Sequence, residues 1–77
     1  MARIFLLNCN SLRSTHRTAL LKDRLKGHSI DICFLQETRV EALALGKSIE
    51  SKLEGKVFWS LTNTRGKGVA MYISNNF

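Results

Sequence analysis

The sequence predicts an α/β fold whose elements follow the order β-α-β, a helical or irregular link, then β-β. Three observations support this prediction. Short runs of β-branched and large apolar residues are typical of buried strands. Leucines recur at helical spacing between the first two runs, over residues 15–26. The last two runs are separated by a segment with Asn and Gly, which is typical of a turn.

The first half of the chain has the pattern of a β-α-β unit. Residues 3–9 predict a strand, and Ser14 or Thr15 is a suitable N-cap for a helix over residues 15–26. Gly27 is well placed to end that helix. Residues 30–35 predict a second strand, and its nearly continuous apolar run favours a strand that is covered on both faces. The helix is expected to place three leucines on one buried face: Leu20, Leu21 and Leu25.

The second half predicts a short helix and a hairpin. Residues 41–53 have helical spacing, although Gly46 interrupts the pattern. Strands are expected over residues 56–61 and 68–73, with a turn over residues 62–67 between them. The aromatic side chains of these strands are assigned to packing rather than to base stacking: Phe58, Trp59 and Tyr72.

Composition narrows the range of functions. The 77 residues are 44% hydrophobic and 23% charged, which is typical of one small folded unit and excludes disorder. Twelve Lys and Arg against six Asp and Glu give a net charge of +6, which favours contact with polyanions such as nucleic acid.

Cysteine usage and the N-terminal segment indicate an intracellular protein. Cys9 and Cys33 lie in apolar runs without a Cys-x-x-Cys pair, so a zinc site is not expected. We expect the protein to reside in a reducing compartment. The apolar run at residues 4–7 is too short for a signal peptide or a membrane span. We therefore expect a nuclear or cytoplasmic protein that is not secreted and has no membrane partner.

Two polar groups follow the first two predicted strands. Asn8 and Asn10 end the first strand, and Glu37 follows the second. A right-handed β-α-β crossover brings such ends side by side, at the sheet edge where α/β proteins bind ligands. Glu37 is a suitable oxygen ligand for Mg²⁺, and the Asn amides are suited to orient a phosphate oxygen or a bound water. The alternative is that the Asn residues form only a turn and that Glu37 is only solvated.

Three motifs in order carry a resemblance to a known family. They are LLNCNSL, DICFLQETR and GKGVAMYIS, and together they span nearly all of the chain. The most specific mark is the tetrad Leu35-Gln36-Glu37-Thr38, with Asn8 as its usual companion. The chain resembles the endonuclease/exonuclease/phosphatase superfamily, and within it most closely the endonuclease of LINE-type non-LTR retrotransposons, followed by AP endonucleases. Asn10 stands where AP endonucleases have Asp and retrotransposon enzymes have Asn, whereas Ser11 departs from the usual Gly.

The resemblance implies a fold that is larger than this chain. Residues 1–77 are expected to form the N-terminal part of a single domain, an incomplete four-layer αββα sandwich. The opposing sheet belongs to a remaining C-terminal half of the domain, which is expected as a partner. We therefore expect an open apolar sheet face and unpaired strand edges, which favour self-association.

The resemblance also implies a reaction, the Mg²⁺- or Mn²⁺-dependent hydrolysis of phosphodiester bonds in DNA. It makes Glu37 the metal ligand, Asn10 a weaker ligand candidate and Asn8 a catalytic polar residue, with Gln36 and Thr38 bracing the site. The Tyr, Asp-x-Asn and Ser-Asp-His segments of the family are not among these 77 residues, so the chain alone is expected to be inactive. Two histidines are assigned to the surface and are not expected to replace the missing one: His16 and His28.

Basic residues flank the predicted site and are candidates for contact with DNA phosphates. They are Arg13, Arg17, Arg39, Arg65 and Lys67. Two alternatives to a DNA endonuclease remain open. One is a small basic module that binds nucleic acid or protein without catalysis, and the other is a phosphatase or phosphodiesterase of the same superfamily that acts on lipids or inositols.

Overall fold

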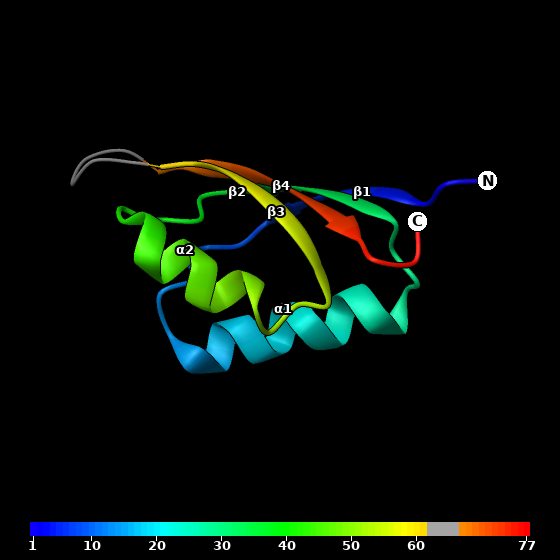
Figure 1. Cartoon of the computed structure of the whole chain (residues 1–77), viewed down its shortest axis with the longest axis horizontal. Coiled ribbons are helices and arrows are strands. Elements are labelled where there is room, and N and C mark those ends of the chain that lie inside the picture. The colour runs from blue at the N-terminus through cyan, green and yellow to red at the C-terminus, as the bar shows by residue number, and fades with distance from the viewer. Residues whose placement is uncertain (62–66) are drawn as a thin grey trace.

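In the computed structural model, which describes residues 1–61 and 67–77, four strands form one sheet and the two helices of the described residues lie on the same side of it (Figure 1). This arrangement confirms the predicted mixed α/β class. The elements in chain order are β1 (Ile4–Asn8), α1 (Thr15–Gly27), β2 (Ile32–Gln36), α2 (Leu43–Glu50), β3 (Gly55–Ser60) and β4 (Val69–Ser74).

The sheet has the strand order β1-β2-β4-β3. β1 and β2 are parallel, in a register that runs from Ile4 opposite Ile32 to Asn8 opposite Gln36. β4 is antiparallel to both β2 and β3. The predicted β-α-β unit and the pairing of the last two strands are therefore confirmed. Residues 62–66 of the predicted turn lie outside the described part of the chain.

Both helices begin and end close to the predicted positions. The Ser14 hydroxyl caps α1 by accepting a hydrogen bond from the Arg17 backbone N–H at 3.1 Å. α2 ends at Glu50 rather than at the predicted residue 53, because the following N–H groups of Lys52 and Leu53 bond to carbonyls three residues earlier and tighten the chain into turns. Neither described helix has the length and apolar character needed to cross a membrane.

The core lies between the helices and one face of the sheet. Alternate strand residues point into it, among them Cys33, Leu35 and Tyr72, which are at most 3% exposed. The predicted packing of Tyr72 and of Leu21 and Leu25 is confirmed: Leu21, Leu25, Ile49 and Leu53 cover these strand residues from the other side.

Leu20 does not lie on the buried helix face, contrary to the prediction. Its side chain is 54% exposed, whereas that of Leu21 is 7% exposed. The reason is geometric, because consecutive helix residues are separated by about 100° around the axis. Leu20 therefore points to the flank of α1.

The other face of the sheet is open and apolar among the described residues. Leu6, Phe34, Met71 and Phe58 are paired in register across the four strands. Phe34 is 46% exposed and Phe58 57% exposed, so the predictions that residues 30–35 are covered on both faces and that Phe58 belongs to the core are wrong. The expected open apolar face is confirmed. Its physical cause is the two-residue period, which turns Cys33 and Leu35 to the helices and Phe34 away from them.

Candidate functional site

The two polar groups meet at one edge of the sheet because the backbone pairing of β1 and β2 continues past both strands. The N–H of Cys9 donates to the carbonyl of Gln36 at 2.8 Å, and the N–H of Ser11 donates to that of Glu37 at 2.7 Å. The N–H of Leu12 then bonds the Thr38 carbonyl at 2.9 Å. These bonds keep the segment after β1 beside the segment after β2, as the β-α-β topology predicts.

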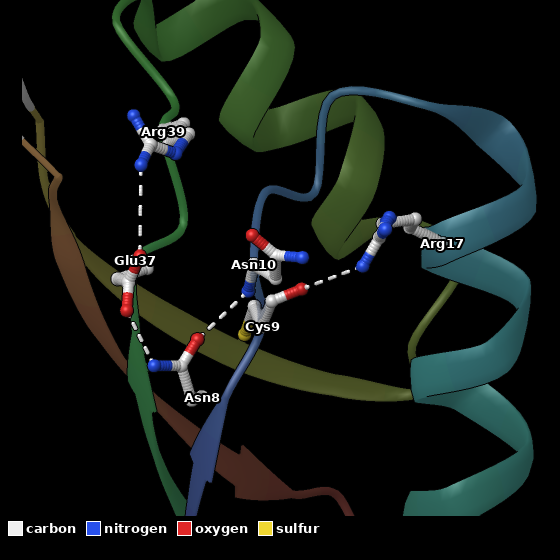
Figure 2. Close-up of polar contacts among 6 residues, drawn as sticks. All are labelled: Asn8, Cys9, Asn10, Arg17, Glu37 and Arg39. Atoms are coloured by element: carbon white, nitrogen blue, oxygen red, sulfur yellow. Dashed lines mark hydrogen bonds and ion pairs between the residues drawn. The ribbon is translucent and has the colours of Figure 1, made fainter.

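Asn8 joins the two segments through its side chain (Figure 2). Its Nδ2 donates a hydrogen bond to Oε2 of Glu37, which lies 29 residues further along the chain. Its Oδ1 accepts a hydrogen bond from the Asn10 backbone N–H at 3.0 Å. Because the acceptor end is occupied by a backbone donor, the NH₂ end of the amide faces the carboxylate.

Glu37 and Arg39 adopt a backbone conformation that could not be predicted from the sequence. Both have a φ of 55°, in the left-handed region that costs an L-residue about 1–2 kcal/mol. Hydrogen bonds to the segment before β4 hold this conformation: the Thr38 N–H donates to the Gly68 carbonyl at 3.2 Å and the Arg39 N–H to the Lys67 carbonyl at 2.8 Å. Strained backbone of this kind clusters at functional sites.

The surroundings of Glu37 favour its ionised form. The hydrogen bond from Asn8 is the largest cause of a lowered pKa, and the charges of Lys67 and Arg39 add to it, while partial desolvation opposes them. Nη2 of Arg39 lies 3.6 Å from Oε1 of Glu37, whose side chain is 24% exposed. Glu37 is therefore a carboxylate at neutral pH that solvent can reach.

One carboxylate is enough for a Mg²⁺ ion that keeps waters and substrate phosphate as its other ligands. Glu37 suits that role. Within the described residues, no group of three or more His, Cys, Asp and Glu side chains is placed to hold a metal ion on its own. Asn10 contributes its backbone N–H to the network, and its predicted role as a ligand stays a prediction.

Gln36 and Thr38 support the site mainly through their backbones. The Gln36 carbonyl holds Cys9, and Thr38 bonds Gly68 and Leu12. The Thr38 side chain is fully buried, and its Oγ1 has no hydrogen-bond partner among the described residues. Leu12, which is not among the site residues predicted from the sequence, is 2% exposed and anchors the loop after β1 in the core. The one feature of the sequence that could have predicted this role is the apolar Leu12 among the polar residues after the first strand.

The predicted phosphate-contact residues fall at different distances from this network. The positive charges of Arg39 and Lys67 both lower the pKa of Glu37. Arg17 reaches the same region from α1, where its Nη1 donates to the Cys9 carbonyl at 3.5 Å (Figure 2). Arg13 is exposed, and its backbone N–H bonds the Ser11 hydroxyl at 3.2 Å. Arg65 lies outside the described residues.

Among the described residues, the side chains of the histidines and cysteines make no hydrogen bond to Asn8 or Glu37. His16 and His28 are exposed, and the His28 ring packs against Phe5 with ring centroids 5.7 Å apart. Cys9 and Cys33 are free. Burial raises the pKa of Cys9 to about 12, with the neighbouring Cys33 as a second cause, and burial raises that of Cys33 to about 11. Both thiols are therefore protonated and unreactive at neutral pH.

Comparisons with known proteins agree with this arrangement. The model of the Endonuclease/Exonuclease/phosphatase family matches residues 5–77. Among solved structures, an AP endonuclease from Archaeoglobus fulgidus is similar, with a TM-score of 0.71 and 29% sequence identity. The similarity covers 95% of this chain and 27% of that chain, so this chain spans a minor part of the archaeal protein's length. No curated protein gives a significant match.

Proposed function

Because the chain belongs to the endonuclease/exonuclease/phosphatase family, we propose that it supplies part of the active site of a phosphodiester-cleaving endonuclease that acts on DNA. The observation that carries the proposal is the contact between Asn8 and Glu37. It presents an ionised, accessible carboxylate at the carboxyl ends of two parallel strands, which is the edge where α/β proteins bind ligands.

In this proposal Glu37 holds a Mg²⁺ or Mn²⁺ ion. A divalent ion at such a site polarises the scissile phosphate and stabilises the leaving oxygen. Asn8 keeps the carboxylate in position and ionised, since its amide is itself held by the Asn10 backbone. Glu37 would thus bind the cation, and Asn8 would orient the Glu37 carboxylate and keep it ionised.

DNA is the proposed substrate and partner. The net charge of +6 favours a polyanion, and cationic side chains surround the carboxylate that would face a phosphate. The proposed phosphate contacts are Arg13, Arg17, Arg39, Arg65 and Lys67. Similarity to an AP endonuclease supports an endonuclease over a lipid or inositol phosphatase.

The retrotransposon-type subfamily is also part of the proposal, supported by Asn10 at the position where AP endonucleases have Asp. Among the described residues, no group of three or more His, Cys, Asp and Glu side chains could hold a metal ion. We therefore assign to these 77 residues only the Asn8 and Glu37 part of the site. Cleavage would need the rest of the domain, and the chain alone would be inactive.

The second candidate function is a basic module that binds nucleic acid without catalysis. The net charge of +6 favours it, because binding to a polyanion needs only basic side chains. The two candidates differ in what Glu37 does. A catalytic fragment needs the carboxylate to bind a divalent ion, whereas a binding module uses only its basic residues.

Mn²⁺ binding to the full 77-residue chain, followed by water-proton relaxation, tests the proposal. We expect Glu37→Gln to weaken Mn²⁺ binding by about tenfold or more, because the amide removes the ligand's charge. Glu41→Gln is the matched control, since Glu41 is an exposed carboxylate nearby in sequence, and it should leave binding unchanged. Equal Mn²⁺ binding by both variants, together with salt-sensitive DNA binding, would instead favour the binding module.

A further inference from the structure

We propose that Arg39 is a positioning residue that occupies one oxygen of Glu37 until a divalent cation takes its place, and that the released guanidinium then binds a DNA phosphate. The inference rests on the proposed function and concerns the regulation of the same site. The exchange would make the basic surface beside Glu37 bind phosphate most strongly when the cation is present.

The two oxygens of Glu37 have partners of different kinds. Oε2 accepts the hydrogen bond from Asn8, whose amide is held in turn by the Asn10 backbone. Oε1 faces only the guanidinium of Arg39, at 3.6 Å, among the hydrogen bonds and ion pairs of the described residues. A cation that approaches Glu37 therefore meets a hydrogen-bonded amide at one oxygen and a partly exposed guanidinium at the other.

Arg39 is the partner that can leave. Its separation of 3.6 Å from Glu37 exceeds the 2.7–3.2 Å typical of an N–H···O hydrogen bond, and its side chain is 43% exposed. Exposed ion pairs of this kind contribute little stability, so breaking this one costs little. The contact with Asn8 stays in place, because the Asn10 backbone holds the Asn8 amide and the paired segments after β1 and β2 keep Asn8 beside Glu37.

A released Arg39 remains beside the site. Its backbone is fixed by the hydrogen bond to the Lys67 carbonyl at 2.8 Å, and Thr38 before it is fully buried. Only the side chain can then swing. A guanidinium presents a planar pair of donors that matches a phosphate, and Lys67 adds a second positive charge nearby.

A purely structural role for Arg39 predicts the opposite result. If the ion pair braced Glu37 for metal binding, removing the guanidinium would loosen the carboxylate and weaken cation binding. If Arg39 competes with the cation, removing it frees Oε1 and strengthens cation binding. The sign of the change in affinity therefore separates the two roles.

The test measures Mn²⁺ binding and binding of a short DNA duplex by the full chain carrying Arg39→Gln. We expect Mn²⁺ to bind about threefold to tenfold more tightly, because a competing positive charge is removed, and the duplex to bind more weakly when Mn²⁺ is present. Arg24→Gln is the matched control: it removes the same charge from an exposed position on α1 and should leave Mn²⁺ binding unchanged.

The double variant Glu37→Gln with Arg39→Gln shows whether the effect acts through Glu37. We expect Arg39→Gln to lose its effect on Mn²⁺ in that background, as a direct coupling requires. In the unsubstituted chain, Mg²⁺ should shift the NMR signals of the Arg39 guanidinium while the Asn8 side-chain amide keeps its contact. This measurement needs no variant to fold.

Unchanged or weaker Mn²⁺ binding by Arg39→Gln would overturn the inference. If Glu37→Gln still abolished binding in that case, the proposed function would stand without it. If neither the unsubstituted chain nor Arg39→Gln bound Mn²⁺ through Glu37, both the proposed function and the inference would fail.

Discussion

Two carboxylates of this chain are held in their ionised form by nearby donors, and they serve different ends. Glu37 is stabilised first by the Asn8 side chain and stays accessible. Glu50, at the end of α2, accepts a hydrogen bond from the Val57 backbone N–H of β3 at 2.7 Å, which is the largest cause of its lowered pKa. The first contact presents a charge to solvent, whereas the second joins a helix to a strand.

At the residue scale, we predict that Glu50→Gln lowers the free energy of unfolding by about 1 kcal/mol at neutral pH, since a neutral acceptor replaces a charged one. The pKa of Glu50 is lowered in the folded state, so its contribution is present above the ordinary pKa of a glutamate. It is lost as the pH falls through the lowered value. Urea unfolding at several pH values should therefore show that the free energies of unfolding of Glu50→Gln and of the unsubstituted chain become equal in acid.

Glu54→Gln is the comparison variant for this prediction. Glu54 forms an exposed ion pair with Lys26 at 3.1 Å, and such pairs contribute little. Its stability should stay close to that of the unsubstituted chain at neutral pH. A loss for Glu54→Gln as large as that for Glu50→Gln would contradict the structural role assigned to the Glu50 contact.

At the scale of elements, a glycine determines how closely α2 approaches β3. A Cβ on Gly46 would lie 3.0 Å from atoms of the Trp59 indole ring, which is closer than ordinary van der Waals contact. Gly46 therefore does not break α2, as its weak helix propensity suggests, but lets the helix rest on the ring. Trp59 packs against the core as predicted, and its Nε1 has no hydrogen-bond partner among the described residues.

The glycines of the two helices give a matched pair of variants. Gly27→Ala should stabilise the chain by about 0.5 kcal/mol, because a Cβ there meets no atom within 4 Å and alanine favours the helix. Gly46→Ala should instead destabilise it by about 1 kcal/mol, since the indole ring must shift. Thermal unfolding of both variants measures the difference. Equal stabilisation by the two would show that the contact with Trp59 does not limit α2.

At the scale of the whole molecule, the two faces of the sheet have opposite characters. Helices cover one face (Figure 1). The other face exposes large apolar side chains. They are Ile4, Leu6, Phe34, Phe58 and Val69. The net charge of +6 opposes contact between copies, but salt screens charge repulsion and leaves apolar attraction in place. Self-association and DNA binding should therefore respond to salt in opposite directions.

We predict that the isolated chain self-associates more as salt rises, and that Phe34→Thr with Phe58→Thr reduces this association while keeping strand-forming residues. Leu43→Gln is the control, because Leu43 is 54% exposed but lies on α2 rather than on the open face. Sedimentation velocity and binding of an apolar dye provide the measurements. A monomeric chain with low dye binding would refute the prediction.

Much of the fold and the meeting of Asn8 with Glu37 could be predicted from the sequence. Strand and helix periods are local properties, and a parallel β-α-β unit brings the ends of its two strands together whatever the details of packing. The motif around Glu37 and the family membership follow from the same local patterns. For these features, short stretches of sequence carry the information.

Only the tertiary structure decided the exposure of Leu20 and Phe58, the packing of Gly46 on Trp59 and the approach of Arg39 to Glu37. The spacing of apolar residues shows which of them share a face of a helix or strand. It does not show which other element covers that face. The left-handed backbone at Glu37 and Arg39 depends on hydrogen bonds to the segment before β4, far away in the sequence. A local pattern cannot contain such a contact, because its cause lies in another part of the chain.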